Sequence, residues 1–158
     1  MRPEPHIYVV TSPAGNVNAL SFLPPEQVFT KGLAPEVIVG WLPLPATEIK
    51  EDSFRPNPIF VRLLHRLIAK HAPTLQALQD EARRLGDGAV YMIDGRAPTP
   101  HGAVDPEDII GVFLAAGAVL PESYQANPNH LLLSRHGWFV LNAQLQEKLL
   151  EELYRIAS

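Results

Sequence analysis

The stretch of sequence that decides the fold is residues 57–86, which read NPIFVRLLHRLIAKHAPTLQALQDEARRLG. Asn57 is a preferred N-cap residue, and Pro58 suits the first position of a helix. Apolar pairs then recur every four positions, the spacing that places them on one helix face. These pairs are Ile59/Phe60, Leu63/Leu64 and Leu67/Ile68. Pro73 interrupts the pattern, and Gly86 suits the end of a second helix. The stretch therefore predicts a helical hairpin over about 58–85.

Segments rich in β-branched and aromatic residues lie on both sides of this hairpin. The expected strands are 7–11, 37–42, 89–93 and 138–141, with 19–23 as a weaker candidate. Residues 109–120 are ambiguous, because the preceding Asp-Pro-Glu-Asp resembles a helix start whereas their Ile, Val and Phe residues favour a strand. We prefer a β-hairpin of 109–114 and 118–124 that turns at 115–117.

The C-terminal segment predicts one more helix, over about 143–157. Asn142 suits its N-cap, and an apolar stripe follows at Leu145, Leu149, Leu153 and Ile156. Together these elements predict the α+β class: a mainly antiparallel sheet with the helical hairpin and the C-terminal helix packed on it.

Composition restricts the possible functions. A chain of 158 residues predicts a single globular domain over 1–158, and 46% hydrophobic against 19% charged residues is an ordinary globular balance. The net charge of −4 argues against nucleic acid as a partner, because such binding depends on basic patches. The chain has no cysteine, which excludes disulfides and thiolate chemistry. No secretory signal or membrane-spanning run is found, so a soluble cytoplasmic protein is expected.

The loop after the strand at 89–93 holds the first candidate site. Its chemistry-bearing residues are Asp94, Arg96, His101, Asp105, Glu107 and Asp108. Carboxylates at a strand end can bind a divalent cation or act as an acid/base pair, and His130 would complete a metal-assisted, hydrolase-like site. The spacing matches no known metal or catalytic motif. The structural alternative, which we favour, is that Asp94-Gly95 forms a turn, Arg96 pairs with a neighbour and the acidic residues belong to a short helical turn.

A second candidate consists of Ser134 with His130 or His136 as its base. No Gly-x-Ser-x-Gly elbow supports a nucleophilic serine, and the two histidines are not spaced as a helical zinc pair. Asn-Pro-Asn at 127–129 and Gly137 instead favour two tight turns.

A third candidate is a basic row on the first helix, formed by Arg62, Arg66 and Lys70 at four-residue spacing. Such a row can bind an anionic ligand. It is also typical of the solvated face opposite an apolar stripe, and positive charge at a helix C-terminus complements the helix dipole.

Because no nucleophile–base pair, metal spacing or cofactor loop is evident, the sequence favours a non-catalytic interaction module that self-associates as a homodimer. This hypothesis predicts an exposed apolar or aromatic patch, with aromatic side chains on an edge strand. No cofactor and no metal are expected. Two alternatives stay open: a metal-assisted hydrolase built from Asp94, Arg96, His101, Asp108 and His130, and an anion-binding adaptor that uses the basic row.

Overall fold

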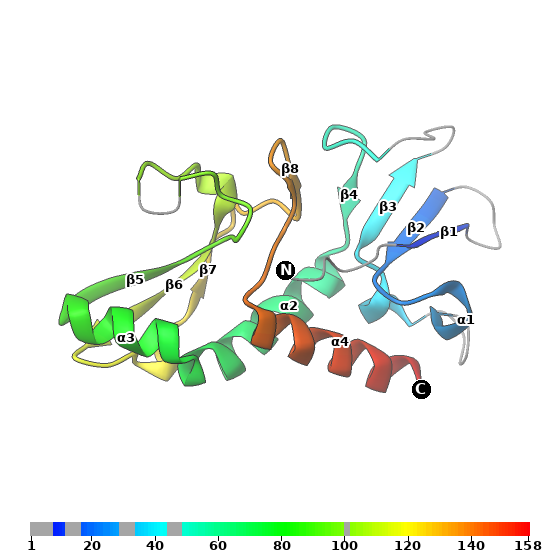
Figure 1. Cartoon of the computed structure of the whole chain (residues 1–158). Coiled ribbons are helices and arrows are strands. Elements are labelled where there is room, and N and C mark those ends of the chain that lie inside the picture. Colours follow the sequence, from blue (N-terminus) through cyan, green and yellow to red (C-terminus); the bar gives the residue numbers. More distant parts are fainter. Residues whose placement is uncertain (1–7, 12–16, 29–33, 44–48, 100–101) are drawn as a thin grey trace. The chain divides into compact units, whose positions relative to one another are not determined.

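The computed structural model describes residues 8–11, 17–28, 34–43, 49–99 and 102–158 (Figure 1). It is an α+β fold, as predicted, built from helices and small antiparallel sheets. The chain divides into two compact units, which we call the terminal unit (residues 1–64 and 146–158) and the central unit (residues 65–145). The expectation of one domain over 1–158 stays a prediction.

The terminal unit contains a four-stranded antiparallel sheet in the order β1-β2-β3-β4. Its strands are β1 (Tyr8–Thr11), β2 (Val17–Ser21), β3 (Gly40–Pro43) and β4 (Arg55–Pro56). The short helix α1 (Pro25–Val28) and the 3-10 turn η1 (Pro35–Val37) connect β2 to β3. Gly40 permits close packing here, because a Cβ atom at this position would lie 2.4 Å from the Phe54 ring and from the Arg55 carbonyl oxygen.

The two predicted helices of residues 58–85 form as α2 (Pro58–His71) and α3 (Gln76–Leu85), joined by the 3-10 turn η2 (Ala72–Thr74). Asn57 caps α2 as expected, since its Oδ1 accepts a hydrogen bond from the Ile59 amide at 3.1 Å. The same buried side chain donates through Nδ2 to the carbonyl oxygens of Pro35 and Ile38. One asparagine therefore starts the helix and anchors the preceding turn.

The central unit contains a three-stranded antiparallel sheet in the order β5-β6-β7 (Figure 1). Its strands are β5 (Asp87–Ile93), β6 (Ile109–Ala116) and β7 (Gln125–Ala126), and α3 packs against β5 and β6. Strand β6 confirms the preference for a strand in the ambiguous segment. The expected second arm at 118–124 is wrong, because only an isolated bridge joins Ala115 to Val119 and the 3-10 turn η4 (Pro121–Ser123) follows. Pro121 lacks the backbone donor that a continuing ladder needs.

The rest of the central unit consists of short elements. The 3-10 turn η3 (Pro106–Asp108) precedes β6, and β8 (Leu133–Ser134) pairs with β9 (Gly137–Trp138) in a small hairpin. Among the described residues the strands therefore form three small sheets, where a single main sheet was expected. Short strands separated by prolines and turn residues leave too few ladder positions for one continuous sheet.

Helix α4 (Ala143–Ala157) begins after Asn142, whose Oδ1 accepts a hydrogen bond from the Gln144 amide at 2.8 Å. Leu145, Leu149 and Leu153 are buried as predicted, whereas Ile156 is half-buried. Within the described part of the chain, none of the helices has the length and apolar character needed to cross a membrane.

Replacing Asn57 tests the anchoring role of this cap. Asn57→Ala removes the cap and the two hydrogen bonds from Nδ2 to the Pro35 and Ile38 carbonyl oxygens, so we expect the free energy of unfolding to fall by about 2–3 kcal/mol. Denaturant titration measures this change. The matched control is Asn142→Ala, an exposed cap with one hydrogen bond, for which about 1 kcal/mol is expected. Equal losses for the two variants would contradict the anchoring role.

Candidate functional site

Four of the predicted site residues come together within the central unit. Asp94 and Arg96 follow strand β5, Asp108 ends η3, and His130 lies in the segment before β8. The His130 Nε2 atom is 2.9 Å from Asp94 Oδ2, and Arg96 Nε is 2.8 Å from Asp108 Oδ1. His101 lies outside the described residues. We call Asp94, Arg96, Asp108 and His130 the Arg96 cluster.

Arg96 occupies the centre of this cluster, and its side chain is only 2% exposed. A guanidinium has five N–H donors, and all five are used here. Nε donates to Asp108. Nη1 donates to the carbonyl oxygens of Leu132 and Gly137, and Nη2 donates to those of Glu107 and Leu131. Arg96 therefore joins the turn before β6 to both ends of the β8–β9 hairpin, with no donor left over for a ligand.

The carboxylate oxygens of Asp94 also all have hydrogen-bond partners, and its side chain is 0% exposed. Its Oδ1 atom accepts hydrogen bonds from the backbone amides of Arg96 at 3.1 Å and Val140 at 2.7 Å. Its Oδ2 atom lies against His130. The carboxylate thus closes the turn after β5 and ties it to the chain that follows β9. The expected Asp94-Gly95 turn is present, and a Cβ atom at Gly95 would lie 2.7 Å from Val140 Cγ1.

Asp108 connects the buried cluster to a more exposed histidine. Burial by itself would raise the pKa of the Asp108 carboxyl, but hydrogen bonds from Arg96 and His136 outweigh it and hold this pKa below its usual value. His136 Nδ1 is 2.6 Å from Asp108 Oδ2, and 24% of the His136 side chain is exposed. His136 is therefore oriented by a buried carboxylate while part of its ring reaches the surface.

The predicted pair of Ser134 with a histidine base does not form. Ser134 is buried, and its Oγ donates to Asp108 Oδ1 at 3.5 Å while accepting the backbone amide of His136 at 3.0 Å. Each of these contacts stabilises the turn between β8 and β9. The buried hydroxyl is therefore a structural group, and neither histidine ring is its partner.

A half-buried pair, His65 and Tyr124, was not singled out from the sequence as an interaction. His65 Nδ1 and the Tyr124 hydroxyl are 2.6 Å apart, and the two rings stack with centroids 5.9 Å apart. Burial, with a further contribution from the charge of His130, lowers the pKa of His65 to about 4. Burial also raises the pKa of Tyr124. Tyr124 lies across Gly111, where a Cβ atom would come within 2.6 Å of its hydroxyl. No short-range sequence signal connects positions 65 and 124.

The basic row of α2 lies on the exposed side of the helix. Arg62, Arg66 and Lys70 are exposed, and none of them has a hydrogen bond or ion pair among the described residues. Arg83 and Arg84 differ, since they pair with Asp80 and Glu81 on the same turn of α3. The row is thus accessible to an anion, with the weak, salt-sensitive attraction of surface charges.

The sheet of the central unit presents an exposed apolar face. Tyr91 is 58% exposed and Leu114 is 51% exposed. Tyr91 pairs with Val112, and Leu114 pairs with Ala89, so the four side chains share one side of the pleat. Ile93 follows a register shift at Met92/Ile93 and lines one groove together with Ala89 and Tyr91. We call Ala89, Tyr91, Ile93, Val112 and Leu114 the apolar sheet face. A groove of about 960 Å³ continues from this face along α3, lined by Leu85, Val104 and Ile109 among others.

Replacing Arg96 tests its role as the central connector. Arg96→Met leaves two buried carboxylates without their counter-charge, so we expect a loss of about 3–5 kcal/mol in the free energy of unfolding. Arg96→Lys should fall between this value and wild type, because it keeps the charge but loses the planar set of donors. Denaturant titration gives both values. Arg83→Lys, on the surface, is the control and should leave the transition midpoint unchanged.

The half-buried His65 predicts a loss of stability in mild acid. Its pKa is about 4 in the folded chain and 6.5 in the unfolded chain, so unfolding takes up a proton between these values. Stability is complete above pH 6.5 and declines as the pH falls, by about 2 kcal/mol between pH 7 and pH 5. Asp108 contributes only at more acidic pH, because its carboxyl pKa in the folded chain is lower than the ordinary aspartate value. His65→Gln should flatten the decline, and an unchanged slope would exclude His65 as its source.

Comparison with known proteins assigns no family to the chain. No family model, curated protein or solved structure matches it.

Proposed function

We propose that this chain is a non-catalytic interaction module that self-associates through the apolar sheet face. The observation that carries the proposal is the exposure of two large apolar side chains, Tyr91 and Leu114, on one side of the β5–β6 ladder. Contiguous exposed apolar surface costs free energy in water and is typical of protein interfaces. Aromatic residues are also enriched at the centres of such interfaces.

The lack of charge on strand β5 favours a second copy of the chain as the partner that covers the apolar sheet face. β5 is an edge strand, because the sheet order is β5-β6-β7. It supplies Ala89, Tyr91 and Ile93 of the apolar sheet face, and its residues after Asp87 carry no charge. The same face on a second copy would therefore oppose no like charges. Glu81 and Arg84 beside the groove pair with each other on one turn of α3 and leave no net charge that would select a charged partner. A two-fold contact, in which each copy offers the same apolar face, satisfies these conditions.

The engagement of Arg96 and Asp94 within the Arg96 cluster supports a non-catalytic role. The donors of Arg96 and the oxygens of Asp94 are all engaged within the described part of the chain, and both side chains are almost fully buried. The hydrolase alternative draws support from the 2.9 Å contact of Asp94 with His130. A carboxylate–histidine contact of this kind occurs in catalytic sites, but here both side chains are buried and a substrate cannot reach them.

The anion-binding alternative draws support from the exposed basic row of α2. This alternative predicts that the chain binds a phosphate ligand, and that the affinity decreases when salt is added or when the charge of Arg66 is removed. Self-association through an apolar face does not predict either effect. The cytoplasmic location expected from the sequence stays a prediction.

The mass of the protein in solution tests self-association. We expect a concentration-dependent dimer by light scattering after size exclusion, and a monomer for the double variant Tyr91→Lys/Leu114→Lys. Because both positions are exposed, the double variant should keep its fold by circular dichroism. The matched control is Tyr154→Lys, an exposed aromatic residue on α4, which should remain dimeric.

A wild-type chain that stays monomeric at protein concentrations up to roughly 1 mM would contradict the proposal. A dimer with a dissociation constant above this concentration has a binding free energy of less than about 4 kcal/mol. A dimer that persists in the double variant would place the interface elsewhere.

A further inference from the structure

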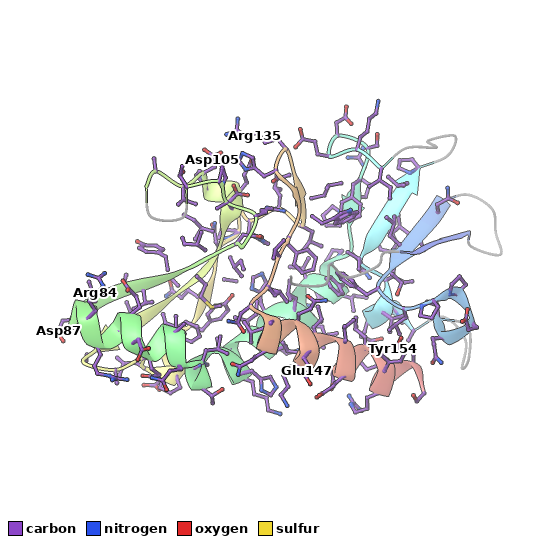
Figure 2. The ribbon with its side chains drawn as sticks, in the orientation of Figure 1. Arg84, Asp87, Asp105, Arg135, Glu147 and Tyr154 are labelled. Atoms are coloured by element: carbon purple, nitrogen blue, oxygen red, sulfur yellow. The ribbon has the colours of Figure 1, made fainter. Side chains whose placement is uncertain are left out.

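Next to the buried Arg96 cluster, three potential metal ligands meet at the surface of the central unit. Asp105 and Glu107 lie at the turn before β6, and His136 lies at the turn between β8 and β9. One ligand atom from each lies within 4.8 Å of the other two. We call Asp105, Glu107 and His136 the outer triad. Figure 2 labels Asp105 beside Arg135, at the edge of this site.

His136 is held in the manner of a metal-ligating histidine. Its Nδ1 atom contacts the buried Asp108 carboxylate at 2.6 Å, and Asp108 is itself fixed by Arg96. A carboxylate behind the ring fixes the tautomer and raises the basicity of the other nitrogen, as in carboxylate–histidine–metal arrangements. With Nδ1 engaged, Nε2 is the nitrogen left to bind an ion. Within the described residues, no hydrogen bond to His136 Nε2 is found.

Glu107 supplies a second, independent indication. Its Oε1 atom is buried and lacks a hydrogen-bond partner within the described part of the chain. Its ionic contact is with Arg135 Nε at 3.3 Å. This ion pair compensates the charge of Glu107 but leaves Oε1 without a hydrogen bond, so the oxygen keeps its capacity to bind an ion or a water molecule.

Arg135 shows that a cation is favourable at this position. Its guanidinium pairs with both Asp105 and Glu107, yet 61% of its side chain is exposed. An exposed arginine can leave the site by rotating into water at little cost. The backbone of both turns is meanwhile held by Arg96, which binds the carbonyl oxygens of Glu107 and Gly137. The ligand-bearing turns are therefore fixed, whereas the cation now present is replaceable.

We propose that the outer triad is a binding site for a divalent transition-metal ion of the Zn²⁺ class, for which Arg135 competes. Two carboxylate oxygens and one imidazole suit Zn²⁺, Mn²⁺ or Fe²⁺, whereas a histidine ligand disfavours Ca²⁺ and Mg²⁺. Three protein ligands leave coordination positions for water or for a further ligand. The site is separate from the apolar sheet face, so this proposal stands or falls independently of self-association.

Calorimetric titration of the tag-free full chain with Zn²⁺ tests the site. We expect one ion per chain, weakened at least about tenfold by Asp105→Asn and by His136→Gln. Arg135→Ala should bind Zn²⁺ more tightly, because it removes the competing charge. A purely structural role for Arg135 predicts no such gain. The matched controls are Asp80→Asn, another exposed carboxylate paired with arginine, and His71→Gln, and neither should change the affinity.

Several outcomes would overturn the proposal. These are the absence of Zn²⁺ binding, binding that Asp105→Asn leaves unchanged, and an Arg135→Ala variant that binds no more tightly than wild type. Asp105 is partly exposed, and among the described residues its side chain forms an ion pair and a hydrogen bond only with Arg135. Asp105→Asn should therefore fold normally even where His136→Gln does not. Mg²⁺ in the same titration should give no comparable binding, and equal binding of the two ions would exclude the imidazole as a ligand.

Discussion

The guanidinium of Arg96 is the interaction on which the rest of the central unit depends. It lies between two buried carboxylates and donates to four backbone carbonyl oxygens from three separate parts of the chain. Buried charges are tolerated only when they are paired and fully hydrogen-bonded. Arg96 meets this condition because its planar donors match the positions of their acceptors. The turn before β6 and the β8–β9 hairpin are therefore held at one place without a large sheet.

This arrangement separates buried residues that stabilise the fold from exposed residues that can bind a ligand, although both groups consist of the same residue types. Asp94, Arg96 and His130 have the chemistry of a catalytic group, but their polar atoms bind one another and the backbone. Asp105, Glu107 and His136 surround the same cluster and retain exposure to solvent. The buried residues give rigidity, and rigid support is what a surface ligand set requires. The apolar sheet face lies elsewhere in the same unit, on β5 and β6.

Much of the helical structure could be predicted from local sequence. The caps at Asn57 and Asn142 use side chains within two residues of the amides that they bind. The apolar stripe of α4 depends on spacing alone. The strands were predicted less well, because pairing depends on residues distant in sequence. β6 pairs with β5 across a long loop, whereas the sequence favoured an adjacent hairpin arm that Pro121 prevents.

For the candidate sites, the sequence alone determined which residue types are available and which local turns they make. It indicated the Asp94-Gly95 turn, which follows from short-range geometry, and the pairing of Arg96 with some neighbour. Only the tertiary structure decided that the neighbour is Asp108, that His136 rests against the same carboxylate and that Tyr91 and Leu114 share an exposed face. The physical reason is that caps and turns involve atoms a few residues apart, whereas burial and convergence are set by contacts that exist only once the chain has folded.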